Sequence, residues 1–401
     1  MVVKLDKIFD SVNKNNIFKD KFVLQTNYTP GTIPHRDREI SQIAAILAPS
    51  LKGEKTSNLF VYGKTGTGKT LSVHYVKNEL FKRVKSQKDG CGLRIEYLNC
   101  KLRKVADTEY RILAELIKKL GGHIPATGLP TESVYNKFVD LVDQDKQLLI
   151  LILDEVDQAV KKISDNFLYN LTRLNSELNK TQISLVGISN DLRFLDNLDP
   201  RVRSSLSEEE IVFSPYNALQ LKDILKGRAE KAFHKNAVGD GVIEKCAAFA
   251  AREHGDARRA LDLLRVAGEI AEREGNQKIK LEHIDLANSK IEKDKILDVI
   301  ESEPKQFQLA LLAIMNLTQG DKKVFTGDVY RAYRELCRKT NTEVLTQRRM
   351  SSIISEFDML GLINAKNISR GTYGKTREIR SAIPPGIEGQ AKTILRGALS
   401  L

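Results

Sequence analysis

The sequence predicts an α/β fold in which helices flank a parallel sheet, followed by an all-α region and a smaller C-terminal domain. Three observations predict this fold. An apolar run at 59–62 leads into a glycine-rich loop, a second apolar run at 148–153 ends in two acids, and three helical patterns near the C-terminus precede two short strands. Continuous apolar runs of this length are typical of strands that are buried on both faces of a parallel sheet.

The loop after the first predicted strand runs from Gly63 to Thr70 and has the sequence GKTGTGKT. It matches the pattern G-x-x-x-x-G-K-[ST], in which backbone N–H groups surround the phosphates of a nucleoside triphosphate. In that pattern Lys69 reaches the β- and γ-phosphates, and the Thr70 hydroxyl can bind Mg²⁺. A glycine-rich turn without a ligand is the alternative. The predicted nucleotide-binding residues of the loop are Gly63, Thr65, Gly66, Thr67, Gly68, Lys69, Thr70 and Leu71.

Acidic and amide side chains follow two further predicted strands. The run at 148–153 ends in Asp154 and Glu155, and a strand at 182–188 is followed by Asn190. We expect Asp154 to hold Mg²⁺ together with Thr70, and Glu155 to orient an attacking water. Asn190 is expected at the same sheet edge, where it would sense the γ-phosphate or hold the water. The alternatives are two solvated acids after a core strand and a helix-capping role for Asn190.

Helical patterns occupy most of the next region, at 218–233, 242–254, 257–274 and 281–302. Gly255 is expected to end one helix and Asp256 to cap the next, which places Arg258 on the first helical turn. An arginine beside the positive end of a helix is poorly placed for local stability, but it is well placed to bind a γ-phosphate. The neighbouring Arg259 is expected to face solvent.

The C-terminal region begins at Pro304 and has the element order of a winged helix. Helical patterns at 308–317, 326–338 and 345–360 precede strands near 362–364 and 376–380, with a glycine-bearing hairpin tip at 369–375. In such a domain the third helix can enter the major groove of DNA while the hairpin lies along the minor groove. A winged helix that contacts protein is the alternative. The predicted DNA-binding residues are Thr346, Gln347, Arg348, Arg349, Ser352, Arg370, Lys375 and Arg377.

The composition predicts a globular protein with a polyanionic partner. The chain has 401 residues, a length that predicts two or three domains, and it carries a net charge of +12. Residues 301–401 hold 16 Lys/Arg and 10 Asp/Glu, and a basic surface of this kind attracts nucleic acid. Basic residues that merely solubilise the surface are the alternative. The four cysteines lack zinc-ligand spacing, and neither an apolar run of 18 residues nor a signal peptide is present, so we expect a cytoplasmic protein with no membrane partner.

Taken together, these motifs resemble the AAA+ ATPases and, among them, the archaeal Orc/Cdc-type origin-recognition initiators. The similarity covers nearly the whole chain. The matching segments are YTP at 28–30 with RDREI at 36–40, the loop at 63–70, Asp154-Glu155, GISN at 187–190, LDPRVRSSL at 198–206, FSPY at 213–216 and GDARRA at 255–260.

The resemblance implies an AAA+ base domain at 1–206, a helical lid at 207–302 and a winged-helix domain at 303–401. It implies that Tyr216 and Arg228 lie against the nucleotide, that Arg258 is a γ-phosphate sensor, and that Arg201, in preference to Arg203, reaches the nucleotide of an adjoining copy. Tyr216 and Arg228 could equally pack the lid or make a surface ion pair. The implied cofactors are ATP or ADP with Mg²⁺, and the implied partners are duplex origin DNA, a replicative helicase and further initiator copies. The implied activity is weak, regulatory ATP hydrolysis. The implied location is the cytoplasm, in association with the nucleoid.

The sequence allows two interpretations of the segment at residues 107–143. Two helical patterns, at 108–120 and 132–142, flank a turn-rich link. The resemblance implies a helical element that approaches DNA, with Leu129, Pro130, Thr131 and Lys137 as candidate contacts. A helix pair that covers the sheet is the alternative.

Two other classes of protein fit parts of the sequence. A clamp-loader subunit shares the base domain but carries a helical collar, and the hairpin pattern at 369–375 argues against it. A nucleotide-switched regulator would use its winged helix to contact protein, and the salt dependence of DNA binding would separate it from an initiator.

Overall fold

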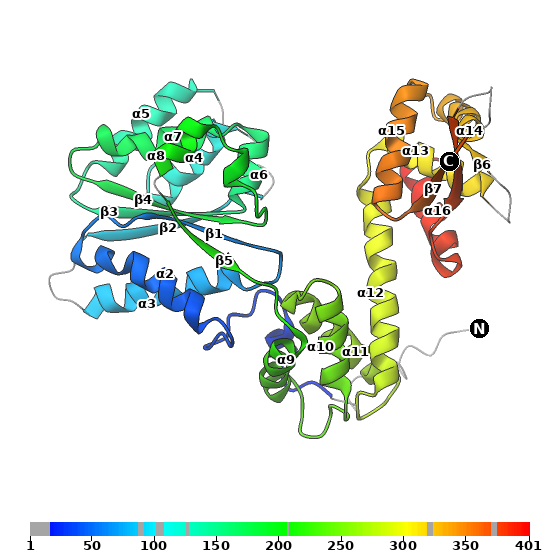
Figure 1. Ribbon diagram of the computed structural model, residues 1–401, viewed down its shortest axis with the longest axis horizontal. Helices are drawn as coiled ribbons and strands as arrows, with labels where there is room; N and C mark the ends of the chain where they lie inside the picture. The colour runs from blue at the N-terminus through cyan, green and yellow to red at the C-terminus, as the bar shows by residue number, and fades with distance from the viewer. Residues whose placement is uncertain are drawn as a thin grey trace. The chain divides into compact units, whose positions relative to one another are not determined.

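The structure is a computed structural model that describes residues 17–86, 92–101, 108–125, 128–206, 208–318, 324–369 and 375–401. For Ser86, Ser369 and Lys375 it describes the backbone only. The fold divides into two compact units, one up to Ile284 and one from Asp285 onward. Figure 1 labels their helices and strands.

A five-stranded parallel sheet organises the first unit, with strand order β2-β3-β4-β1-β5. β3 is buried at every position and β4 at all but its first, as the apolar runs predicted. The loops that follow β1, β3 and β4 therefore meet at one edge of the sheet. The strands are β1 Asn58–Gly63, β2 Leu93–Asn99, β3 Leu148–Asp154, β4 Gln182–Ser189 and β5 Glu208–Phe213.

Helices cover both faces of this sheet, as Figure 1 shows. Ile150 and Ile152 of β3 pack on the side of α2 and α3, whereas the alternate residues Leu149, Leu151 and Leu153 pack on the side of α4 and α5. These faces are covered by α2 Asp37–Leu47 and α3 Lys69–Ser86 on one side, and by α4 Glu109–Lys119, α5 Thr131–Val142, α7 Asn166–Arg173 and α8 Pro200–Leu206 on the other, with α6 Val156–Lys162 directly after β3.

The segment at 107–143 supplies α4 and α5, and both pack on the sheet through buried apolar side chains such as Leu116 and Phe138. The helix pair thus covers the sheet, as the structural alternative expected. Leu129 in the link is 41% exposed, and Lys137 donates a hydrogen bond to the His123 carbonyl at 2.8 Å. Ala126, Thr127 and Asp107 lie outside the described residues.

Three helices of the first unit form its lid: α9 Ala218–Ala232, α10 Val242–Arg252 and α11 Ala257–Arg273. Asn217 and Gln220 form a capping box that starts α9. The described N-terminal segment lies against these helices, because Phe18 pairs with Phe233 and the amides of Lys19 and Asp20 both donate to the Ala232 carbonyl. The short 3₁₀ helix η1 Lys21–Leu24 continues this segment and packs against α9 and α11.

The second unit is a winged helix, which confirms the predicted fold. Its sheet is antiparallel, with strand order β6-β8-β7, and its core surrounds fully buried Tyr333 and Phe357. A C-terminal helix, which the sequence analysis did not predict, packs on the same core through Leu395 and Leu399. The elements are α13 Lys305–Leu317, β6 Val324–Phe325, α14 Thr326–Lys339, α15 Gln347–Met359, β7 Ile363–Ser369, β8 Lys375–Ser381 and α16 Pro385–Leu399, preceded by α12 Leu281–Ser302.

In the part of the chain that the structure describes, we find no helix long and apolar enough to cross a membrane. Cys100, Cys246 and Cys337 are free and buried, and Cys91 lies outside the described residues.

Gly187 offers a test of the packing between β4 and β1. A Cβ atom on Gly187 would lie 2.3 Å from Cε1 of Phe60, which is 1% exposed. We expect Gly187→Ala to lower the free energy of unfolding by about 1–3 kcal/mol through overpacking. Gly227→Ala in α9 is the control, because an added Cβ there has no atom within 4 Å and should stabilise the helix slightly. Thermal unfolding without nucleotide measures both, and equal melting temperatures would contradict the described packing.

Candidate functional site

A cavity of about 630 Å³ lies in the first unit, at the carboxyl edge of the sheet and beneath the lid. This volume is in the range of small-molecule sites, ~300–1,000 Å³. The sequence-predicted residues that line it are Thr65, Gly66, Gly68, Lys69, Thr70, Leu71, Asp154, Glu155, Asn190, Tyr216, Arg228 and Arg258. Residues far apart in the sequence thus meet around one cavity.

The glycines of the loop allow the lid to approach it closely. Gly66 has a φ of +73°, and a Cβ atom there would lie 1.7 Å from Oδ1 of Asp256. Gly68 has a φ of +91°, and its Cβ would lie 2.9 Å from the Tyr216 hydroxyl. Ala257 also donates its amide hydrogen to the Gly66 carbonyl at 3.2 Å. Both glycines therefore meet two requirements at once: each has a left-handed backbone, and each lies close to a side chain that follows β5, Asp256 at the start of α11 or Tyr216 before α9.

The Lys69 ammonium lies at the base of the loop and is almost fully buried. It donates hydrogen bonds to the carbonyls of Gly63 (2.7 Å) and Lys64 (2.9 Å) and to Oδ1 of Asn190 (2.9 Å). Burial lowers the pKa of this ammonium to about 8. Asn190 uses its amide to contact Lys69, so the strand ends meet as the sequence analysis expected.

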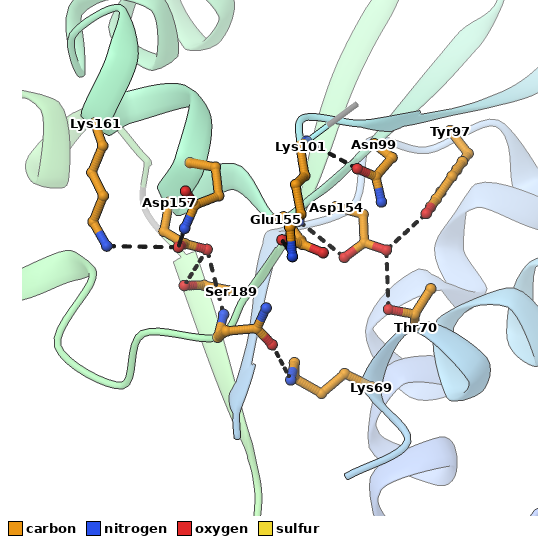
Figure 2. A network of polar contacts seen from close by, with 12 residues as sticks. Lys69, Thr70, Tyr97, Asn99, Lys101, Asp154, Glu155, Asp157, Lys161 and Ser189 are labelled. Carbon is orange, nitrogen blue, oxygen red and sulfur yellow. Dashed lines mark hydrogen bonds and ion pairs between the residues drawn. The ribbon is translucent and has the colours of Figure 1, made fainter. Parts of the chain in front are cut away.

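Asp154 is held in place by three donors, as Figure 2 shows. Its Oδ2 accepts hydrogen bonds from the hydroxyls of Thr70 (3.0 Å) and Tyr97 (2.7 Å), and its Oδ1 accepts one from the Glu155 amide (2.9 Å). Burial raises the pKa of Tyr97, so its hydroxyl remains a donor. A threonine hydroxyl in contact with a carboxylate is a donor set that suits Mg²⁺. The sequence analysis did not identify Tyr97, because β2 was not predicted.

Glu155 has a backbone conformation that is rare for its residue type. Its φ is +54°, in the left-handed region, and residues held in such conformations cluster at functional sites. Its Oε2 lies 3.5 Å from Nζ of Lys101, a cavity-lining residue at the end of β2. Glu155 therefore faces the cavity with a lysine beside it.

Asp157 holds the end of β4 through Ser189 and Asn190, on the side away from Asp154 and Thr70 (Figure 2). Its buried Oδ1 accepts hydrogen bonds from the Ser189 hydroxyl at 3.1 Å and from the Asn190 amide at 3.4 Å, and Lys161 lies 3.9 Å from its Oδ2. This carboxylate holds the backbone that presents the Asn190 side chain to Lys69. The sequence analysis did not identify it, although it lies three residues after Asp154.

Arg258 lies on the first turn of α11, as predicted, and its exposed side chain lines the cavity. Asp256 caps this helix and accepts a hydrogen bond from the Arg258 amide at 2.7 Å. The expectation that Arg259 faces solvent was wrong. Its side chain is only 14% exposed, because it pairs with Glu253 at 3.0 Å.

Tyr216 and Arg228 line the cavity and also pack the lid. Arg228 donates to the Val23 carbonyl at 2.8 Å and lies 4.4 Å from the centre of the Tyr28 ring. Gly63 and Thr67 support the loop without lining the cavity: the Gly63 carbonyl accepts from Lys69, and the Thr67 hydroxyl donates to the Lys64 carbonyl at 2.8 Å.

Arg201 and Arg203 both lie on α8. Arg201 is 83% exposed and pairs with Asp199 at 3.1 Å, whereas Arg203 is 48% exposed and pairs with Asp196 at 3.2 Å. Arg201 is therefore the more accessible of the two.

The start of α15 forms an exposed polar surface on the winged helix. Thr346 caps the helix by accepting from the Arg349 amide at 3.3 Å, and Arg349 lies 3.5 Å from Glu356 and 5.6 Å from the centre of the Phe307 ring. Arg348 is exposed on the same turn. The exposed predicted residues of this surface are Thr346, Gln347, Arg348, Arg349 and Ser352.

Arg377 behaves differently from these exposed residues. It donates to the Ser351 carbonyl at 3.1 Å and to the Ser355 hydroxyl at 2.7 Å, so it fastens the hairpin to α15. Arg370 and the side chain of Lys375 lie outside the described part of the structure.

This combination of a phosphate loop, a helical lid and a winged helix defines an AAA+ ATPase with a C-terminal winged helix. Three family models match the chain: an AAA ATPase domain at residues 32–186, a Cdc6 AAA+ ATPase-type lid domain at 222–289 and a CDC6 C-terminal winged helix domain at 298–387. Membership in this class implies that the protein binds a nucleotide.

Comparison with known proteins identifies one family within this class. The chain is 52% identical over 387 residues to the ORC1-type DNA replication protein of Pyrococcus abyssi, covering 95% of this chain and 91% of that protein. It is 46% identical over 395 residues to ORC1-type DNA replication protein 1 of Methanosarcina mazei, covering 98% and 94%. The chain therefore belongs to the family of ORC1-type DNA replication initiators, which confirms the resemblance seen in its motifs.

A solved structure supports the same assignment. The structure of the Aeropyrum pernix ORC1 protein in complex with DNA is 43% identical, with a TM-score of 0.84, and the match covers 95% of this chain and 97% of that chain. The CDC6 protein of Pyrobaculum aerophilum shares the fold at 22% identity, with a TM-score of 0.60.

Proposed function

We propose that this protein is an ATP-regulated initiator that binds duplex DNA at a replication origin. The observation that carries the proposal is the site in the first unit, where Lys69, Asn190 and Asp154 meet around a cavity that the lid closes. Together with a winged helix that exposes arginines at the start of α15, it supports a protein in which nucleotide state controls DNA binding. The DNA complex of the Aeropyrum pernix relative supports the same partner.

We assign the following roles in the nucleotide site. The loop residues and Lys69 bind the phosphates, and Tyr216 and Arg228 lie against the rest of the nucleotide. Thr70 and Asp154 hold Mg²⁺, which supplies charge neutralisation at the phosphates. Asn190 and Arg258 approach the γ-phosphate from the base and from the lid, and Glu155 orients the attacking water.

Slow, regulatory hydrolysis is part of the proposal. The ion pair between Glu155 and Lys101, at 3.5 Å, supports it, because the carboxylate that would orient the attacking water is engaged by a lysine. We also propose base, lid and winged-helix domains at 1–206, 207–302 and 303–401. Arg201, exposed on α8, is the proposed contact to the nucleotide of a further initiator copy.

On DNA, we propose that α15 reads the major groove through Gln347 and Arg348, with Thr346, Arg349 and Ser352 near the backbone. The hairpin residues Arg370 and Lys375 are proposed to bind phosphates, and Arg377 holds hairpin and helix together. We also propose that the protein is associated with the nucleoid and that it recruits a replicative helicase. Footprinting on genomic DNA from the source organism tests whether the binding is site-specific.

The nucleotide roles predict different losses for two variants. Lys69→Ala should weaken ATP binding about 10- to 100-fold, because a charge-assisted contact to phosphate is removed. Glu155→Gln should keep ATP binding but lose hydrolysis. A fluorescent ATP analogue and a phosphate-release assay measure the two quantities. Lys82→Ala, on the exposed side of α3 with a side chain 72% exposed, is the control, and normal hydrolysis by Glu155→Gln would remove its assigned role.

The metal site predicts an effect of Tyr97. Tyr97→Phe removes one donor to Asp154 and should weaken Mg²⁺-dependent ATP binding about tenfold, while binding without Mg²⁺ stays unchanged. Titrating Mg²⁺ at fixed ATP measures this difference. Tyr135→Phe is the matched control, because the Tyr135 hydroxyl also contacts a carboxylate, Glu177 at 3.4 Å, outside the cavity. Equal Mg²⁺ dependence in both variants would contradict the assignment.

The proposed DNA surface predicts that arginine substitutions lower the affinity for DNA only where the arginine lies on α15 or on the hairpin. Arg348→Ala should weaken binding to the origin about tenfold. Combining it with Arg370→Ala should reduce the slope of log affinity against log salt by about 0.9 for every phosphate that the variant no longer neutralises. Arg331→Ala is the control, because Arg331 is 78% exposed on α14 and pairs with Asp328. If the double variant binds like Arg331→Ala, the assignment of DNA contacts to Arg348 and Arg370 is wrong.

A further inference from the structure

Arg36, the residue just before α2, is a buried charge at the back of the phosphate loop. It is 3% exposed. Its Nε donates to the Thr67 carbonyl at 2.9 Å, its Nη1 contacts Oε1 of Glu39 at 2.7 Å, and its Nη2 donates to the Ser214 carbonyl. One planar group thus binds both the loop and the segment between base and lid, residues 214–217, which we call the linker.

The face of the same guanidinium lies against the linker tyrosine. Its central carbon is 4.0 Å from the centre of the Tyr216 ring and 5.2 Å from that of Phe213. The hydroxyl of Tyr216 in turn lies close to Gly68, as shown by the 2.9 Å separation from an added Cβ. Arg36 and Tyr216 therefore support the loop at Thr67 and Gly68 from one side.

Tyr216 continues this connection to the lid. Its amide donates to the Gly255 carbonyl at 3.3 Å, and a Cβ atom on Gly255 would lie 2.3 Å from the Tyr216 carbonyl oxygen. Gly255 directly precedes the cap of α11, the helix that carries Arg258. A continuous set of contacts thus leads from the loop through Arg36 and Tyr216 to the start of α11.

Burial of a charge at this position has a free-energy cost that an apolar side chain would avoid. Arginine offers what an apolar residue or lysine lacks, namely several donors in a fixed plane and a flat face for aromatic stacking. The two carbonyls that it binds belong to segments far apart in the sequence. A rigid guanidinium between them fixes their separation, so a shift of the loop must move the linker.

We propose that Arg36 is a positioning residue that couples occupation of the phosphate loop to the position of the lid. It does not line the cavity and acts through Thr67 on one side and through Ser214 and Tyr216 on the other. This inference rests on the proposed function, since it concerns how ATP at the loop is transmitted to α11 and Arg258.

The test uses the full-length protein with two variants. Arg36→Lys keeps the charge but cannot bridge both carbonyls in one plane, and Arg94→Lys is the matched control. Arg94 is a half-buried arginine of β2 that pairs with Glu96 at 2.9 Å and donates to the Lys119 carbonyl at 2.7 Å, outside the cavity. The readouts are ATP affinity and amide hydrogen exchange at Ser214, Tyr216 and Ala257, each with and without ATP.

We expect ATP to slow exchange at these amides in the wild-type protein and in Arg94→Lys. In Arg36→Lys, ATP should bind on the order of tenfold more weakly, and at saturating ATP the slowing at Ser214 and Tyr216 should be absent. A residue that only stabilised the fold would lower the melting temperature and leave the ATP-dependent slowing intact. If Arg36→Lys does not fold, Glu39→Gln replaces it, because it removes the charged partner of Nη1 without touching the cavity lining and should weaken the same response.

The outcomes separate this inference from the proposed function. Equal slowing in Arg36→Lys and wild type would overturn the coupling role and leave ATP-regulated initiation standing. Absence of ATP binding to the wild-type protein would overturn both. ATP binding to the wild type without any change at the linker would overturn the coupling role and the lid closure on which it depends.

Discussion

Parallel pairing of β1, β3 and β4 is the constraint on which the candidate site depends. Because the three strands run in one direction, the loop after β1, the acids after β3 and Asn190 after β4 emerge at the same edge. Lys69 can then contact Asn190, and Thr70 can contact Asp154, although about 85 to 120 residues separate the partners. The sheet is buried on both faces, so these distances are set by the core and not by the loops.

Three charged side chains of the site are buried away from water. Lys69, Asp154 and Asp157 are each at most 5% exposed, and every one of them has hydrogen-bond partners from neighbouring strand ends or from the loop. Buried charges are tolerated only when they are paired in this way. Contacts within the protein hold the Lys69 ammonium and the Asp154 carboxylate at one edge of the sheet, which limits the reorganisation that the proposed phosphate binding requires.

Sequence reasoning predicted the central strands, the lid helices and the winged helix, because continuous apolar runs and helical periodicity can be read directly from the sequence. It missed the edge strands β2 and β5, which carry Arg94, Glu96 and three consecutive glutamates instead of apolar runs. Tyr97 and Lys101 were missed with β2. The burial of Arg36 and of Arg259 depends on partners that tertiary contacts supply, Ser214 and Glu253, and local pattern contains no signal for either.

Arg377 has a consequence for how the winged helix can change during evolution. Because its guanidinium holds the hairpin to Ser351 and Ser355 of α15, the spacing between the two proposed DNA-facing elements is set inside the protein. In the proposed DNA surface, an exposed side chain such as Arg348 can be exchanged without moving either element, so a change of the recognised sequence requires no change in the angle between helix and hairpin. Replacing Arg377 would instead release both elements together.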